Sequence, residues 1–284
     1  MFNHLAVNPG SAGNQNQICA SLIARQQWMG IEGAPQTTLA AISTPITPFG
    51  IESGIGLTLL SDQLGFYNNF NMKFDYAYRL DLGSGKLGVG LGLGFENRSL
   101  QSIAWEAFDP VPQDHTIVQQ DDSKLVFDMD FGAFYRNDKF YAGASITHLN
   151  GANVEFNTSG STYLSRHIYL TGGYNFELKD PRFEIEPSIF FKTDGSSMQI
   201  DINTNLIYNK KIWGGVTYRT TDAIVALFGI KFGNNLKLGL AYDITTSKLG
   251  YNYGGQGSVE IFVGYCFNIL KDKTPQKYKS VRIL

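Results

Sequence analysis

The amino-acid sequence predicts an all-β protein, a transmembrane antiparallel β-barrel of about 14 strands with a narrow or plugged lumen. The first observation is a period-2 pattern, which residues 70–80 show clearly. One side of this segment is apolar and the other mostly polar: Phe70, Met72, Phe74, Tyr76, Tyr78 and Leu80 against Asn71, Lys73, Asp75, Ala77 and Arg79. The pattern recurs along almost the whole chain in segments of about ten residues, as in barrels whose apolar faces meet lipid.

The composition agrees with this fold class. The chain has 20 Phe, 15 Tyr and 31 Gly, and only 17% of its 284 residues are charged, so strand formers dominate. No run of about 18 apolar residues occurs, which excludes a helical membrane protein. The formal net charge of -2 argues against a nucleic-acid partner. The pattern has no linker-like break, so we expect one barrel domain at 17–268, between an N-terminal segment (1–16) and a tail (269–284).

Fourteen strands follow from period-2 runs bounded by Gly, Asn, Asp and Pro clusters, and the number is even, as in single-chain bacterial barrels. They are predicted near residues 17–25, 37–44, 53–61, 67–80, 86–98, 125–135, 140–148, 167–176, 183–192, 199–208, 212–219, 223–232, 236–245 and 258–267. Short connections at 83–85, 136–139, 209–211 and 233–235 alternate with long ones at 99–124, 150–166 and 246–257. Short periplasmic turns and long extracellular loops are typical of outer-membrane barrels, so both termini are predicted to be periplasmic.

The predicted inner face carries charges of both signs. It includes Lys73, Asp75, Arg79, Arg98, Asp128, Asp130, Glu184, Glu186, Lys192, Asp201, Arg219, Lys231, Lys237, Asp243 and Glu260. Interleaved opposite charges favour a lumen crossed by ion pairs over a charge-selective pore. The alternating glycines of 88–94 leave bare backbone on that face, which favours close packing by a bulky group.

Signals for catalysis or metal binding are weak. The histidines, at positions 4, 115, 148 and 167, show no metal-ligand spacing, and no nucleophile elbow is present. Ser145 and His148 are an odd number of residues apart, so a strand would place them on opposite faces. The acidic pairs Asp121-Asp122 and Asp128/Asp130 are interpreted as solvated acids, because no dense loop supplies the oxygens that Ca²⁺ needs. We therefore predict no enzyme, no cofactor and no metal.

The two cysteines lie on the first and last predicted strands. Cys19 follows Gln17 at the start of the barrel, and Cys266 lies near its end. Both are predicted to face inward across the closure seam, near the periplasmic rim. The sequence leaves open whether they form a disulfide or remain two free thiols.

Residues outside the strands suggest contacts with other molecules. The opening residues 1–6 lack a signal peptide, so we interpret the chain as a mature or truncated form, with its first segment a plug or a periplasmic arm. Aromatic residues in predicted loops are candidate partner-binding residues: Trp28, Trp105, Phe108, Tyr251 and Tyr253. Basic residues of the tail are candidate periplasmic contacts: Lys271, Lys273, Lys277, Lys279 and Arg282.

Four stretches carry a family resemblance. They are Asn-Pro-Gly-Ser-Ala-Gly at 8–13, Gln-Trp-Met-Gly-Ile-Glu-Gly-Ala-Pro at 27–35, and residues 74–80 and 140–149. With these stretches the chain resembles the PorP/SprF family of type IX secretion system outer-membrane proteins over nearly its whole length. It departs at Gly10, where relatives usually carry Ala, and we expect this to be a small change in a turn.

The resemblance implies a non-enzymatic outer-membrane component of the secretion system. Such a protein anchors or helps export a cell-surface adhesin used in gliding and attachment, binds the adhesin's C-terminal domain outside, and associates inside with periplasmic or peptidoglycan-binding proteins. Three alternatives remain open from the residues. A channel or transporter for a small or hydrophobic solute would conduct in a planar bilayer, and a lipid-acting enzyme would react with a serine hydrolase label. A soluble β-protein, the alternative at the level of the fold, would partition without detergent.

Overall fold

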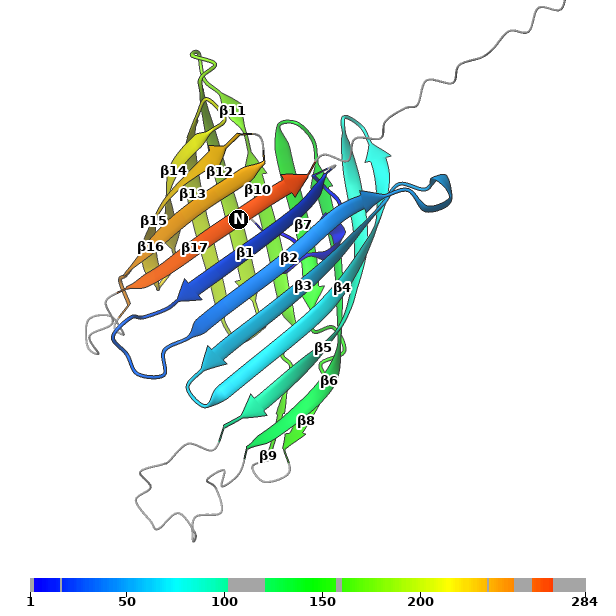
Figure 1. The fold of residues 1–284 in the computed structure, drawn as a ribbon, viewed down its shortest axis with the longest axis vertical. Coiled ribbons are helices and arrows are strands. Elements are labelled where there is room, and N and C mark those ends of the chain that lie inside the picture. The colour runs from blue at the N-terminus through cyan, green and yellow to red at the C-terminus, as the bar shows by residue number, and fades with distance from the viewer. Residues whose placement is uncertain are drawn as a thin grey trace, which may run out of the picture.

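The computed structural model describes residues 3–15, 17–101, 121–156, 160–233, 235–247 and 257–267. Within this part of the chain, fourteen antiparallel strands close into one barrel (Figure 1). In chain order they are β1 (Ile18–Gln26), β2 (Gln36–Ile46), β3 (Ser53–Leu64), β4 (Tyr67–Leu82), β5 (Gly85–Leu100), β6 (Asp122–Arg136), β7 (Phe140–Thr147), β10 (His167–Tyr174), β12 (Phe183–Thr193), β13 (Met198–Tyr208), β14 (Ile212–Arg219), β15 (Ala223–Phe232), β16 (Leu236–Thr245) and β17 (Ser258–Phe267).

The barrel closes between its first and last strands. β17 lies beside β1, with Ile18 opposite Phe267 and Gln26 opposite Val259. Three short strands lie outside the ring: β8 (Asn153–Phe156) and β9 (Gly160–Tyr163) pair only with each other, and β11 (Phe176–Glu177) extends the pairing of β12. The predicted fold class and strand number are confirmed, and predicted strand ends differ from the observed ones by at most three residues.

The alternation of side chains follows the sequence pattern. On β4, Phe74 on the outer face is 51% exposed, whereas Lys73 and Asp75 on the inner face are 5% and 0% exposed. Exposed apolar residues surround the barrel in the same way on the other strands. An apolar exterior and a polar interior are what a bilayer requires of a barrel, because lipid contacts only the outer face. Within the described residues, no helix is long and apolar enough to cross a membrane.

The two ends of the barrel differ. We call the end where β1 begins and β17 ends the terminal end, and the opposite end the loop end. The connections 101–121, 148–166 and 246–257 all lie at the loop end, as predicted. The predicted length asymmetry nevertheless holds only in part, since 47–52 and 175–182 are longer connections at the terminal end and 65–66 is a tight one at the loop end.

The wall formed by β4, β5 and β6 is the tallest part of the barrel. These strands have 16, 16 and 15 residues, whereas a tilted strand needs only about 9–11 residues to cross a bilayer. The N-terminal segment (residues 3–15) lies against the inner side of this wall, where its 3-10 turn η1 (Pro9–Ser11) contacts β4, β5, β6 and β7 (Figure 1). The lumen is therefore narrowed by the chain's own first residues.

Candidate functional site

The candidate site is the lumen, beginning with the N-terminal segment. Its central residue is Asn8, which is 2% exposed. The Asn8 Nδ2 group donates to the carbonyl oxygens of Ala133 on β6 (3.0 Å) and Ala144 on β7 (3.3 Å). The Asn8 Oδ1 atom accepts a hydrogen bond from the Gly10 N–H at 2.9 Å and caps the 3-10 turn, with Pro9 at its first position. One side chain therefore both shapes the turn and attaches it to two strands.

Glycines allow this close contact. A Cβ atom added at Gly90 would lie 2.5 Å from the Gly10 nitrogen, and one added at Gly10 would lie 2.7 Å from the Gly88 oxygen and 2.8 Å from the Gly132 oxygen. These neighbours are backbone atoms, which cannot turn aside as a flexible side chain would. The glycine strip predicted to receive a bulky group thus receives the N-terminal segment. The expectation that glycine at position 10 is a small change is wrong, since this packing leaves no room for alanine.

Other strands hold the segment by donating to its carbonyl oxygens. The Lys73 Nζ group lies 3.1 Å from the Ala6 oxygen, and the Ser145 Oγ group lies 2.7 Å from the Val7 oxygen. The Arg79 guanidinium also donates to the Gly13 carbonyl oxygen. Because backbone carbonyls buried away from water need donors, these bonds allow an irregular segment to lie inside the barrel.

His4 packs at the start of the segment between two rings. Its ring centroid lies 5.0 Å from that of Phe134 and 4.9 Å from that of Tyr141. Burial disfavours the charged imidazolium and lowers the pKa of His4 to about 3. The docked segment therefore holds this histidine in its neutral form.

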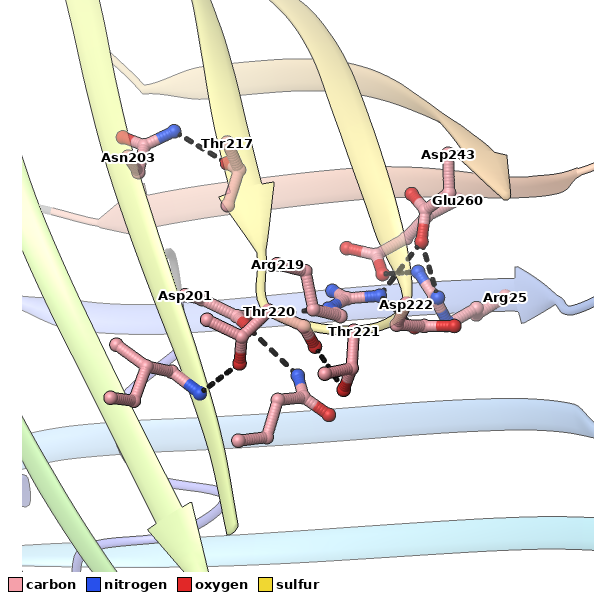
Figure 2. Close-up of polar contacts among 12 residues, drawn as sticks. Arg25, Asp201, Asn203, Thr217, Arg219, Thr220, Thr221, Asp222, Asp243 and Glu260 are labelled. Carbon is pink, nitrogen blue, oxygen red and sulfur yellow. Dashed lines mark hydrogen bonds and ion pairs between the residues drawn. The ribbon is translucent and has the colours of Figure 1, made fainter. Parts of the chain in front are cut away.

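A network of ion pairs crosses the lumen near the loop end (Figure 2). Asp243 on β16 is its centre, because its Oδ2 atom lies 2.6 Å from Arg25 Nη2 and 2.9 Å from Arg219 Nη1. Arg25 also bonds Glu260 at 3.1 Å, and Arg219 also bonds Asp201 at 3.2 Å. Since β1 and β14 are separated by three strands in the sheet order, the network spans a chord of the barrel. This agrees with the predicted lumen of interleaved charges.

A second polar network lies on the tall wall. Lys73 Nζ bonds Asp130 Oδ2 at 2.6 Å, and His148 Nδ1 lies 2.9 Å from Asp128 Oδ2. Asp128 and Asp130 are 2% and 1% exposed, so the interpretation of this pair as solvated acids is wrong. For the pair Asp121-Asp122 the interpretation is right for Asp121, which is exposed, and wrong for Asp122, which is 8% exposed.

The predicted opposition of Ser145 and His148 is also wrong. β7 ends at Thr147, and His148 has a φ of 55°, so strand alternation stops before it and its ring turns inward to Asp128. Ser145 Oγ also faces inward and donates to the Val7 oxygen. Sequence spacing gave the wrong face because it assumed that the strand continued.

The lumen retains a small cavity. It has a volume of about 200 Å³, and apolar and charged side chains line it, among them Ile23, Trp213, Phe262, Arg25 and Arg219. Trp213 is inward-facing and its indole packs over Gly229, where a Cβ atom would lie 2.6 Å from the Nε1 atom. The sequence marked Asn8 only as part of the stretch 8–13 that carries the family resemblance, and it gave no role to Trp213, although an Asn before Pro is a recognisable turn-capping signal.

The two cysteines are joined. Cys19 and Cys266 are directly opposite each other across the closure seam, their Cα atoms are 4.1 Å apart, and a disulfide links their Sγ atoms. The bridge lies at the terminal end of the barrel, near the start of β1 and the end of β17. It is on the inner face, which Ser21 and Gly264, the next residues of β1 and β17 on that side, share with it. It links strands that are 247 residues apart in sequence.

Of the candidate partner-binding residues, the structure describes only Trp28. It follows β1 at the loop end, where its N–H donates to Ser258 Oγ at 3.1 Å and the Met29 N–H donates to the Gly257 oxygen at 2.8 Å. These bonds fasten the first loop to the start of β17. The remaining candidates lie outside the described residues: Trp105, Phe108, Tyr251, Tyr253, Lys271, Lys273, Lys277, Lys279 and Arg282.

Comparisons with known proteins agree with this architecture. The family model described as "Type IX secretion system membrane protein PorP/SprF" matches residues 1–265. No curated protein sequence matches the chain. Among solved structures, the TodX deltaS2S3 mutant monoaromatic hydrocarbon channel is similar with a TM-score of 0.51 and 11% identity, covering 93% of this chain and 94% of that one. The outer membrane protein Omp33 of Acinetobacter baumannii is similar with a TM-score of 0.49 and 7% identity, covering 89% of this chain and 98% of that one. At these identities the likeness concerns the fold alone.

Proposed function

The chain belongs to the PorP/SprF family of type IX secretion system membrane proteins, and on that premise we propose that it is a non-enzymatic scaffold of this system in the outer membrane. In this role it anchors or helps export a cell-surface adhesin and links it to periplasmic secretion and gliding machinery. The observation that carries the proposal, beside family membership, is the filled lumen. A barrel whose interior holds its own N-terminal segment and a cross-lumen ion-pair network is suited to support partners at its ends.

The loop end is the proposed adhesin-binding side, with both termini periplasmic. The long connections lie there, and Trp28 is fixed at the base of the first loop by its bond to Ser258. Trp105 and Phe108, which the sequence places in the connection between β5 and β6, would give such a partner aromatic contact area with few rotatable bonds. At the terminal end, the basic residues after Phe267 provide a charged arm for a periplasmic protein.

Substitution at the loop end tests the anchoring role. Replacing Trp105 and Phe108 by Ser should release the adhesin into the medium while the barrel still assembles. Phe49→Ser is a matched control, because Phe49 is fully exposed in the 3-10 turn η2 (Pro48–Gly50) at the terminal end and should leave the adhesin on the cell. Retention of the adhesin by the double variant would contradict the proposed site.

Truncation tests the other side. A chain that ends after Phe267 should recover less of the periplasmic partners in a pull-down and should keep the adhesin. Labelling of intact cells with a membrane-impermeant thiol reagent tests the orientation, since a cysteine placed at Asn137 should stay unlabelled and one placed at Gln113 should react. The reverse labelling would overturn the orientation.

One observation favours the alternative of a channel or transporter. The lumenal cavity of about 200 Å³ combines Trp213 and Phe262 with charged residues, a mixture that can hold a small solute. The ion-pair network between Arg25 and Arg219 lies beside this cavity and restricts passage towards the loop end. Conductance of the pure protein distinguishes the two functions.

A further inference from the structure

Three side chains on the tall wall converge near the loop end of the lumen. Glu96 on β5, Asp128 on β6 and His148 just after β7 each offer one ligand atom, and these atoms lie within 4.8 Å of one another. Carboxylate oxygens and imidazole nitrogens are ligands of Zn²⁺ and similar divalent transition metals. With bonds of about 2.0–2.2 Å, two tetrahedral ligands of one ion lie about 3.4 Å apart, so modest side-chain movements bring the three together.

The His148 and Asp128 side chains are already paired and need to separate by only about 0.5 Å to reach this spacing. His148 Nδ1 and Asp128 Oδ2 are 2.9 Å apart. The backbone N–H of His148 donates to Asp130 Oδ1 at 3.0 Å, which fixes His148 in its left-handed backbone conformation. An ion between the two atoms replaces their hydrogen bond, with the neutral imidazole carrying its proton on Nε2 instead. Glu96 accepts from Arg98 through Oε1, which leaves Oε2 for an ion.

A second imidazole stands beside the first. The ring centroid of His167, on β10, lies 5.9 Å from that of His148, with the two rings nearly perpendicular. The His167 Nδ1 atom lies 2.8 Å from the Ser165 carbonyl oxygen, which can only accept a hydrogen bond. Nδ1 therefore carries the ring proton, and Nε2 keeps the lone pair that a metal needs. Fixing of one ring nitrogen by a backbone carbonyl is the usual support of a metal-ligating histidine.

The charge around these side chains also calls for a cation. Six charged side chains form one patch on this wall: the buried carboxylates of Asp75, Glu96, Asp128 and Asp130 and the cationic groups of Lys73 and Arg98, whose formal charges add to -2 with neutral histidines. Asp75 is 0% exposed, and neither of its carboxylate oxygens has a hydrogen-bond partner among the residues that the structure describes. Asp75 is in register with Gly92, and Gly92 with Asp130, so it belongs to the same patch. Buried excess charge is costly unless a counter-ion or protons neutralise it.

We propose that this patch binds one divalent transition-metal ion of the Zn²⁺ type, with Glu96, Asp128 and His148 as ligands. His167, whose ring lies 5.9 Å from that of His148 and outside this group of three, becomes the fourth ligand when its side chain moves towards the ion. One such ion brings the formal charge of the patch to zero. Because its ligands come from β5, β6, β10 and the residue that follows β7, the ion ties together the wall that supports the connection 148–166. The site is independent of the proposed secretion role, so either can fail without the other.

Cobalt binding tests the site directly. The full chain is purified in detergent, treated with a chelator, exchanged into metal-free buffer and titrated with Co²⁺. The proposal predicts the visible absorption of four-coordinate Co²⁺ at one equivalent and its displacement by Zn²⁺. Asp128→Asn and His148→Gln should each weaken Co²⁺ binding more than tenfold, and His167→Gln should weaken it and change the spectrum.

Glu260→Gln is the matched control, since Glu260 is another lumenal carboxylate at the loop end and pairs with Arg25. This variant should bind Co²⁺ as the parent chain does. Barrel assembly is checked in every variant by far-ultraviolet circular dichroism and by the Cys19–Cys266 bridge. Failure of the assembled parent chain to bind Co²⁺ or Zn²⁺ would overturn the proposal and mean that protons balance the carboxylates. Equal losses in Asp128→Asn and Glu260→Gln would overturn it as well, because binding would then be non-specific.

Discussion

Asn8→Ala is the sharpest test of how the N-terminal segment is held. The substitution removes three hydrogen bonds: two from Nδ2 to the carbonyl oxygens of Ala133 and Ala144, and one from the Gly10 N–H to Oδ1. At about 1 kcal/mol each, they contribute about 3 kcal/mol to docking. Since about 1.4 kcal/mol is a factor of ten, the released population should rise about 100-fold.

Hydrogen exchange measures this release. The N–H groups of Ser11 and Ala12 bond to carbonyl oxygens within the docked segment, so their exchange reports its opening. Exchange should accelerate about 100-fold in Asn8→Ala, with the strand amides unchanged. Asn3→Ala is the matched control, because among the described residues Asn3 makes one side-chain hydrogen bond, 3.2 Å long, to Ser21 Oγ, and it should accelerate exchange by about fivefold or less. Equal exchange rates in Asn8→Ala and the parent chain would refute the role given to Asn8.

Three further predictions concern charge and covalent closure. The pKa of His4 is about 3 in the docked segment and about 6.5 in a free chain, so docking weakens as the pH falls through 6.5. The hydrogen-exchange rate of the segment, corrected for intrinsic rates, should therefore rise about 30-fold from pH 7.5 to pH 5. His4→Phe should abolish this rise. Arg219→Ala removes the cationic partner of Asp201 and one of the two cationic partners of Asp243, and it should lower the free energy of unfolding by about 3–5 kcal/mol, measured by urea titration in liposomes. Arg182→Ala removes a solvent-exposed pair and should have no measurable effect, and equal stability of both variants would contradict the network's role. Cys19 and Cys266 should resist alkylation in denatured, non-reduced protein and react after reduction, and full labelling before reduction would exclude the bridge.

The strands were predictable because their side chains obey one local rule. Lipid selects apolar residues on the outer face of every strand, so Phe74 and Asp75 reveal their faces without knowledge of their neighbours. The same rule identified the inward charges, including Arg219 and Asp243. The rule could not predict which charges pair. Arg219 lies on β14 and Asp243 on β16, and the distance between their side chains depends on the tilt and register of the strands.

Irregular backbone limited what the sequence could predict in the lumen. The sequence left open whether residues 1–16 form a plug or a periplasmic arm, because local patterning does not specify where a segment without strand periodicity lies. Its docking depends on backbone atoms approaching Gly88, Gly90 and Gly132, which is a tertiary contact. The predicted orientation of His148 was wrong for a related reason. Its positive φ, directly after β7, turns its side chain to the face opposite to the one that strand alternation assigns.

Metal-ligand spacing in the sequence could not reveal the cluster of Glu96, Asp128 and His148 for a different reason. Spacing rules describe ligands on one helix or one loop, whereas these residues come from successive strands of a barrel. Strand pairing, which sets Gly94 opposite Asp128, brings them together. Only the register of the sheet shows that they are neighbours.

The most direct test of a filled, supporting barrel is the conductance of the intact protein. The purified chain is inserted into a planar lipid bilayer, with a water-filled porin as the positive control for insertion and recording. We expect no stable single-channel openings, because the N-terminal segment and the network around Asp243 occupy the lumen. Stable, reproducible openings from the intact chain would contradict it and favour a channel or transporter.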